Sequence, residues 1–203
     1  DGKTYAFCWV ADAMHSAAGR ADLIKEAGLA YPDSYDELMT VCKAVDKKAG
    51  VRAFLTENHH GWIFPPIMMN HGGKVFRNPP DDLMPALDSP ENEAAIAWYA
   101  NLLNSYSPDG ILSYTYDQAT AALKQGRGNY SFFNQAFLLQ MAAADSKVKD
   151  TVAYGMYPKG PAGRYPGVAV HGWGIPVGAK SKEASWEFIK WAVSKEMFTR
   201  MLT

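Results

Sequence analysis

The chain has 203 residues, of which 48% are apolar, so it can form one substantial domain or two small ones with a hydrophobic core. Its formal net charge is −1 without a block of like charges, which argues against a nucleic-acid-binding protein because such proteins usually carry a basic surface. No apolar run reaches the roughly 18 residues that a membrane-spanning helix needs.

The first half of the chain alternates short β-prone runs with helical patterns. Ser34 and Glu37 have the spacing of a capping box, in which each side chain binds the other residue's backbone at a helix start. Leu38, Val41 and Cys42 follow at helical spacing, so that helix is amphipathic and Cys42 is expected to be a buried free thiol. In chain order, the expected elements are a strand at 3–10, a helix at 20–27, a helix between Ser34 and Gly50, a strand at 51–55, a short helix at 67–70 and a loop at 74–87.

The second half of the chain opens with a strong helix start. Ser89 and Pro90 are typical of the N-cap and of the first helical position. Ile96, Tyr99 and Leu103 then form one apolar stripe along the helix. The remaining expected elements are a helix at 117–125, a strand at 129–133, a helix at 134–144, a strand at 151–157, a strand pair or bend at 168–177 and a helix at 182–195. Helices with short strands between them indicate an α/β or α+β fold.

Three of the five histidines, His59, His60 and His71, lie close together in the sequence and raise the question of a metal site. Adjacent histidines on a strand point to opposite faces, and the sequence has no HExxH or CxxC motif, so no metal is expected. It also has neither a GxSxG elbow nor a Walker loop. These absences leave no motif for a nucleophilic enzyme or a nucleotide site.

Short motifs along the whole chain occur in a distinctive order. They are DGKTYA at 1–6, RADLIKEAGL at 20–29, PDSYDEL at 32–38, GG at 72–73, SPE at 89–91, LKQG at 123–126, YGMYPKGP at 154–161, GWGIP at 172–176 and SKEASWEF at 181–188. In this order and spacing, the chain resembles the extracellular solute-binding proteins of sugar ABC importers, family 1, which include the maltose-binding proteins.

The resemblance implies a periplasmic-binding-protein-like fold of type II, in which two α/β lobes close around a ligand. Residues 1–203 would then be mainly the second lobe, helix-rich with a small central sheet, as a fragment of a two-lobe protein. The N-terminal lobe and the C-terminal helices would lie outside this chain.

The chain departs from the family pattern at several positions, one of which bears on the ligand. Ala18 and Gly19 stand where the family often has two aromatic residues. Ala136 stands near the position of a tryptophan that stacks on sugar in the maltose-binding branch, which argues against maltose itself as the ligand. Phe133 and Phe137 are the neighbouring residues that could take the place of that tryptophan.

A sugar site needs an aromatic platform for the flat apolar face of the ring, and planar donors and acceptors for the hydroxyl groups. Trp62 lies at a family position of a sugar-stacking aromatic, the alternative being a core tryptophan beneath its loop. Trp173 lies between two glycines that leave its indole free to face a cleft, the alternative being a hinge-side core residue. The other candidate ligand-binding residues are Asp12, Asn134, Gln135, Gly172, Trp9, His171, Glu57 and His59.

Two of these candidates have specific alternatives. Asp12 matches an acidic ligand position of the maltose-binding branch, but it could equally cap the next segment. Asn134 and Gln135 follow a strand and begin a helix, where their amides could bind hydroxyl groups or Asn134 could simply serve as the N-cap.

The resemblance implies the substrate-binding component of an ABC importer, a monomer that captures a carbohydrate between its lobes and delivers it to the membrane permease. It implies no catalysis, cofactor or metal, and a location in the periplasm or on a lipid anchor outside the cell. Two alternatives remain. The same fold could bind a polyamine, phosphodiester or metal chelate. A glycosidase would need two facing carboxylates, for which Asp12 and Glu57 are the only candidates near this site.

Overall fold

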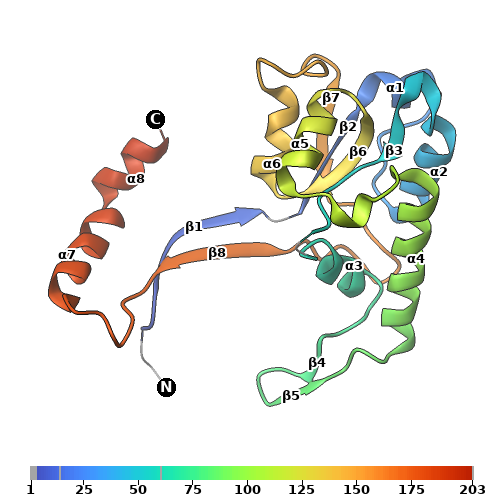
Figure 1. Ribbon diagram of the computed structural model, residues 1–203. Coiled ribbons are helices and arrows are strands. Elements are labelled where there is room, and N and C mark those ends of the chain that lie inside the picture. Colours follow the sequence, from blue (N-terminus) through green and yellow to red (C-terminus); the bar gives the residue numbers. More distant parts are fainter. Residues whose placement is uncertain (1–3, 14, 60, 203) are drawn as a thin grey trace. The chain divides into compact units, whose positions relative to one another are not determined.

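The computed structural model describes residues 4–13, 15–59 and 61–202 (Figure 1). They fall into two compact units, which we call unit 1 (Asp1–Asp12 with Val168–Thr203) and unit 2 (Ala13–Gly167). Within the described ranges, no helix is both long and apolar enough to span a membrane.

Unit 2 is built on a four-stranded sheet in the order β3-β6-β2-β7. The strands are β2 (Ser16–Arg20), β3 (Arg52–Phe54), β6 (Gly128–Phe133) and β7 (Val152–Met156). β3 runs parallel to β6, whereas β2 runs antiparallel to both β6 and β7. Strands β3, β6 and β7 therefore end at one edge of the sheet, where β2 begins, and we call this the carboxyl edge.

Strand β2 is a central strand of the sheet that the sequence does not predict. Its residues are SAAGR, without the β-branched or aromatic side chains that mark a strand. Ala17 and Ala18 are fully buried, and a Cβ atom at Gly19 would lie 2.8 Å from Cδ2 of Tyr130. Small residues are needed here because this central strand is packed between bulky neighbours.

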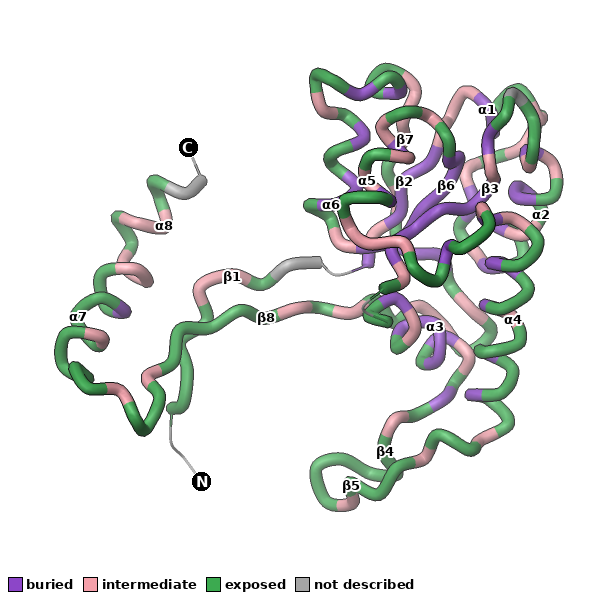
Figure 2. The backbone as a smooth tube through the Cα atoms, viewed as in Figure 1, coloured by how far each residue is buried: buried purple, intermediate pink, exposed green. Residues whose placement is uncertain are grey.

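Helices cover both faces of this sheet, and the buried residues concentrate around it (Figure 2). Every residue of β6 is buried, as expected for a central strand with helices on both sides. The apolar face predicted for α2 is confirmed, since Leu38, Val41, Cys42 and Val45 are buried and Cys42 is a free thiol. The helices are α1 (Ala21–Glu26), α2 (Tyr35–Val45), α3 (Phe64–Asn70), α4 (Pro90–Tyr106), α5 (Tyr116–Lys124) and α6 (Gln135–Leu139), with single 3₁₀ turns at Lys48–Gly50, Ile111–Ser113 and Gln140–Ala142.

Two segments of unit 2 differ from the prediction. Residues 74–87, expected to be a loop, form a hairpin of β4 (Phe76–Asn78) and β5 (Asp82–Pro85). The hairpin has little sequence signal because its residues are mostly exposed and include two adjacent prolines. Helix α3 begins at Phe64, ahead of the predicted start, and carries its prolines in the first turn.

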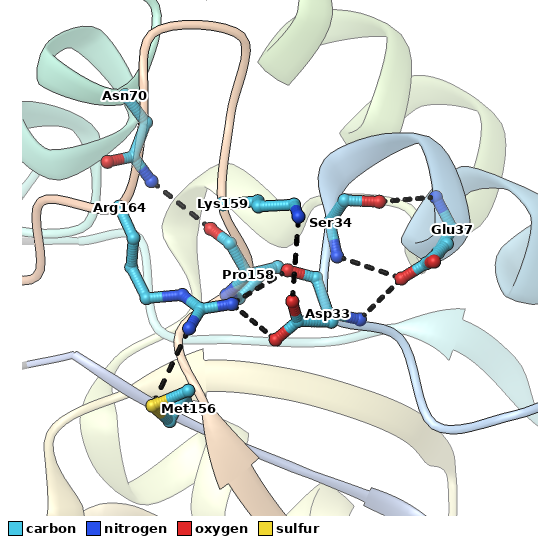
Figure 3. A network of polar contacts seen from close by, with 8 residues as sticks. All are labelled: Asp33, Ser34, Glu37, Asn70, Met156, Pro158, Lys159 and Arg164. Carbon is cyan, nitrogen blue, oxygen red and sulfur yellow. Dashed lines mark hydrogen bonds and ion pairs between the residues drawn. The ribbon is translucent and has the colours of Figure 1, made fainter.

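A polar network fastens the loop that follows β7 to the start of α2 (Figure 3). Arg164 pairs with the carboxylate of Asp33, and its Nη2 also donates to the carbonyl oxygen of Asp33 over 3.1 Å. The backbone N–H of Asp33 donates to Oε2 of Glu37 over 2.7 Å. Ser34 and Glu37 form the predicted capping box. Helix α2 therefore begins at a point that is itself fixed to the loop after β7.

Unit 1 pairs β1 (Phe7–Ala13) with β8 (Val168–Trp173) in a two-stranded sheet and continues into α7 (Lys182–Ala192) and α8 (Lys195–Leu202). Strand β1 begins four residues later than predicted, at Phe7 in place of residue 3. The ring of Phe7 packs on Trp186 of α7 with centroids 5.1 Å apart. Aromatic packing thus joins the sheet of this unit to its first helix.

Candidate functional site

The carboxyl edge of unit 2 gathers three loops that come from different parts of the sequence. Ser16, at the start of β2, pairs with Phe133 at the end of β6 and with Met156 at the end of β7. The hydroxyl group of Thr56, just after β3, donates to the carbonyl oxygen of Phe132 over 3.1 Å. Ligand sites of α/β sheets typically form at such an edge.

Trp62 lies in the loop between β3 and α3, and its side chain is 54% exposed while the next residue, Ile63, is buried. Gly61 precedes it with a positive φ of 67°, a backbone conformation that glycine adopts without strain. This turn holds Ile63 in the core and leaves the indole of Trp62 in solvent. Trp62 is therefore not a core residue, and its contact with a ligand stays a prediction.

Asn134 and Gln135 follow β6 directly. Oδ1 of Asn134 accepts the backbone N–H of Phe137 over 2.7 Å, so this side chain is the N-cap of α6. Its oxygen is occupied by that role. Gln135 is exposed, so it is the better placed of the two residues for binding a hydroxyl group.

Glu57 and His59 lie between β3 and Trp62 but differ in exposure. Glu57 is fully buried, and its charge is among the causes that raise the pKa of Tyr99, after burial of that phenol. The hydroxyl group of Tyr99 donates to Oδ1 of Asn58. His59 is exposed. Glu57 thus lies beneath the loop, and His59 lies on its surface.

His15 is a polar residue at the carboxyl edge that sequence reasoning misses. It precedes β2, is 5% exposed, and packs edge-on against Tyr157 with ring centroids 5.5 Å apart. Burial lowers the pKa of His15 to about 4, an effect that the nearby backbone of Trp62 partly offsets. Neither ring nitrogen has a hydrogen-bond partner among the described residues. The sequence could not point to His15 because the residues of β2, which follow it, do not have the pattern of a strand.

Phe133 and Phe137 do not replace the tryptophan that is missing at Ala136. Their side chains are 5% and 0% exposed, and the two rings pack edge-to-face with centroids 5.3 Å apart. They belong to the core between β6 and α6, where burial of the apolar rings stabilises the fold. Ala136 itself is exposed, so this place at the edge carries no aromatic face.

The remaining candidates lie on β1 and β8 of unit 1. The ring of Trp9 lies 6.4 Å from that of His171 and 6.1 Å from that of Trp173, measured between centroids. Trp173 is 38% exposed and packs edge-on against Phe188, on the wall of a pocket of about 420 Å³. The side chain of Asp12 lies outside the described part of the structure.

Gly172 has a packing role in this sheet. A Cβ atom there would lie 3.2 Å from Cβ of Ala6 and 3.3 Å from the carbonyl oxygen of Phe7. The glycine therefore allows β1 to approach β8 closely. The ten candidates thus divide between the two units, and the rings of Trp9, His171 and Trp173 lie close together in unit 1.

The histidines of the 56–73 stretch have separate surroundings. Nδ1 of His71 lies 2.8 Å from the carbonyl oxygen of Ile67, and its ring packs against Tyr35 and Trp98. His60 lies outside the described residues. Among the side chains that the structure describes, no three His, Cys, Asp or Glu residues are grouped to hold a metal ion.

Unit 2 is thus a mixed α/β unit with an exposed tryptophan at the carboxyl edge of its sheet, the edge at which ligand sites of α/β proteins typically form. The chain belongs to the family of bacterial extracellular solute-binding proteins, whose profile matches residues 2–197. This match confirms the family and the fold class that the motifs predict. No curated protein matches the chain.

Solved structures of similar proteins have the same fold. An ABC transporter solute-binding protein from Agrobacterium radiobacter K84 in complex with ribitol is 27% identical, with a TM-score of 0.82 over 98% of this chain and 51% of that one. One from Agrobacterium vitis S4 with bound D-mannitol is 24% identical, with a TM-score of 0.79 over 97% and 48%. Maltose-bound MalE3 of T. maritima is 22% identical, with a TM-score of 0.83 over 98% and 52%. The chain spans about half the length of these proteins.

Proposed function

We propose that this chain is part of the substrate-binding component of an ABC importer, in which it forms mainly the second lobe. The whole protein captures a carbohydrate in the cleft between its lobes and delivers it to the membrane permease. It works as a monomer without catalysis or cofactor, in the periplasm or on a lipid anchor outside the cell. The sugar or polyol bound to the similar proteins supports the carbohydrate as the ligand class.

The observation that carries this proposal is the exposed indole of Trp62 at the carboxyl edge. A soluble protein gains free energy by burying a tryptophan, so an indole left 54% exposed on a turn that places Ile63 in the core suggests a stacking platform. The exposed amide of Gln135 and the ring of His59 add donors and acceptors for hydroxyl groups at the same edge.

The buried position of Glu57 weighs against a glycosidase. The two catalytic carboxyl groups of such an enzyme stand about 5–9.5 Å apart on either side of a sugar. Glu57 is fully buried beneath the loop, where no sugar reaches its carboxylate without rearrangement. A solute-binding role requires no such pair.

The test is a thermal-shift screen of the full-length protein against monosaccharides, alditols, oligosaccharides, polyamines and phosphodiesters. A ligand that binds the native state raises the melting temperature by mass action. We expect a shift with a carbohydrate, and we expect Trp62→Ala to abolish it while the melting temperature without ligand stays unchanged. A shift with polyamines or phosphodiesters alone would contradict the proposed carbohydrate ligand and indicate a charged solute.

A further inference from the structure

The imidazole of His15 is a buried polar group to which the proposed ligand site gives no role. Its ring packs edge-on against Phe133 at the end of β6, with centroids 6.4 Å apart, and against Tyr157 just after β7, with centroids 5.5 Å apart. In the part of the chain that the structure describes, neither ring nitrogen has a hydrogen-bond partner. The imidazole is therefore held between the ends of two strands while its polar atoms remain unpaired.

The two rings that hold His15 are themselves fixed. Phe133 is buried, and it pairs across the sheet with Ser16, the residue that follows His15. Tyr157 is also buried, and its hydroxyl oxygen accepts a hydrogen bond from the hydroxyl group of Tyr35 over 3.2 Å. Because close-packed side chains in a core keep to their preferred rotamers, the ring of His15 has little freedom to turn. Its two nitrogens therefore point in fixed directions.

The backbone of Trp62 faces this ring. Burial lowers the pKa of His15 to about 4, and the backbone of Trp62 acts in the opposite direction. A backbone group that raises the pKa of a histidine presents its carbonyl oxygen, because the negative end of that dipole stabilises the protonated ring. The carbonyl group of Trp62 thus points towards the imidazole, although the two groups do not have the geometry of a hydrogen bond.

This arrangement restrains the turn that carries the indole. A neutral imidazole has one N–H group, and a buried N–H group that loses its acceptor is destabilising. Movement of Trp62 away from His15 would withdraw a carbonyl oxygen from the buried ring. Ile63 holds the same turn by its buried side chain, whereas His15 acts on the backbone of Trp62 itself.

We infer that His15 is a positioning residue of the ligand site, whose neutral imidazole holds the backbone of Trp62 and so fixes the direction in which the indole faces a ligand. A platform that is already in its binding orientation loses less conformational entropy on binding than a mobile one. The inference rests on the proposed stacking role of Trp62 and adds to it a residue that acts without touching the ligand.

The first experiment observes the indole of Trp62 in the absence of any ligand. The full-length protein is labelled with 5-fluorotryptophan, and Trp62→Phe assigns the fluorine resonance of Trp62. We expect His15→Leu to shift or broaden this resonance, because leucine offers no N–H group to the Trp62 carbonyl oxygen. Val41→Ala, which opens a space in the buried face of α2, is the control for general destabilisation and should leave the resonance in place. An unchanged resonance in a folded His15→Leu protein, or an equal change in the control, would overturn the inference.

Conservative variants separate the polar role of His15 from its bulk. The amide nitrogen of asparagine takes roughly the place of Nδ1, and that of glutamine roughly the place of Nε2, so His15→Asn or His15→Gln should keep the N–H group that faces Trp62. We expect one of these two variants to restore the parental resonance, and the one that does so identifies the nitrogen. Equal changes in the leucine, asparagine and glutamine variants would show that His15 only fills space, and would overturn the inference.

Calorimetric titration of the full-length protein with ribitol, mannitol and maltose then connects the position of the indole to binding. We expect the affinity for the tightest of these probes to fall by about fivefold or more in His15→Leu, and to recover to within about twofold in the restoring amide variant. An unchanged affinity beside a changed resonance would overturn the role of His15 in the ligand site. If the parent protein binds none of the three, the proposed carbohydrate function loses support, and the fluorine spectra alone decide whether His15 holds Trp62.

Discussion

The side-chain amide of Asn70 donates a hydrogen bond to the hydroxyl oxygen of Tyr35 over 3.0 Å and so joins the end of α3 to the start of α2. Asn70 is fully buried. Its Nδ2 also donates to the carbonyl oxygen of Pro158 over 3.2 Å, and its Oδ1 accepts the backbone N–H of Tyr165 over 2.6 Å (Figure 3 shows Asn70 with Pro158). One amide thus ties together α2, α3 and the loop after β7.

Replacing this amide should be costly for stability. Asn70→Ala removes the hydrogen-bond partners of the buried Pro158 carbonyl group and of the Tyr165 backbone N–H, so we expect a loss of about 3 kcal/mol in the free energy of unfolding. Urea denaturation measures this change in the free energy of unfolding. Asn104→Ala, at an exposed position of α4, is the control and should change the free energy by less than about 0.5 kcal/mol. Equal effects of the two substitutions would contradict the role of Asn70.

The close packing of β2 leads to a second prediction. In Gly19→Ala, the new methyl group would meet Cδ2 of Tyr130 at 2.8 Å in the middle of the sheet. Overpacking of this kind costs roughly 1–3 kcal/mol. A Cβ atom at Gly178 would meet nothing within 4 Å, so Gly178→Ala should be neutral or slightly stabilising. Thermal unfolding of both variants decides the matter, and a neutral Gly19→Ala would refute the packing argument.

The buried ring of His15 makes stability depend on pH. Its pKa is lowered from 6.5 to about 4 in the folded protein. Between these values the unfolded chain binds more protons than the folded one. The free energy of unfolding therefore does not depend on this group above pH 6.5, and it falls as the pH drops towards 4, by at most about 3 kcal/mol. We expect His15→Leu to flatten this slope in urea titrations from pH 4 to 7.

A matched histidine separates this effect from general acid denaturation. His59 is exposed, so His59→Gln should keep the slope of the parent protein. If His15→Leu and the parent lose stability in parallel below pH 6.5, the buried imidazole is not the source of the dependence.

The length of the chain leads to a prediction about binding by the 203-residue fragment itself. It spans about half of the similar proteins, and in a two-lobe receptor part of the binding free energy comes from contacts that the other lobe makes when it closes on the ligand. We therefore expect the 203-residue chain alone to bind the ligand of the full-length protein weakly or not at all. Calorimetric titration with micromolar affinity for the fragment would disprove this expectation.

Local patterns predicted the elements whose sequence signals are strong. The capping box at Ser34 and the apolar spacing through Val45 determine α2 from local rules, and the structure agrees. Ser89 and Pro90 likewise mark the start of α4. Strand β2 escaped prediction because its sequence reflects the bulk of Tyr130 beside it, a tertiary constraint that no local pattern carries.

In the candidate site, too, some residues could be predicted from the sequence and others could not. Trp62 could be singled out because an aromatic residue at a family position is visible in the sequence, and its exposure agrees with that choice. The exposure of Phe133 and Phe137 could not be judged, because burial depends on how α6 packs on β6. His15 could not be found at all without knowing that β2 begins beside it.

The two-stranded sheet of unit 1 has a consequence for the order of folding. Its strands β1 and β8 lie on opposite sides of unit 2 in the sequence, so their pairing closes a loop that contains the whole of that unit. Closing a loop of that length is entropically costly while the intervening chain is unfolded and much cheaper once it is compact. Unit 2 should therefore fold first, and pulse-labelling hydrogen exchange should find β6 protected before β1.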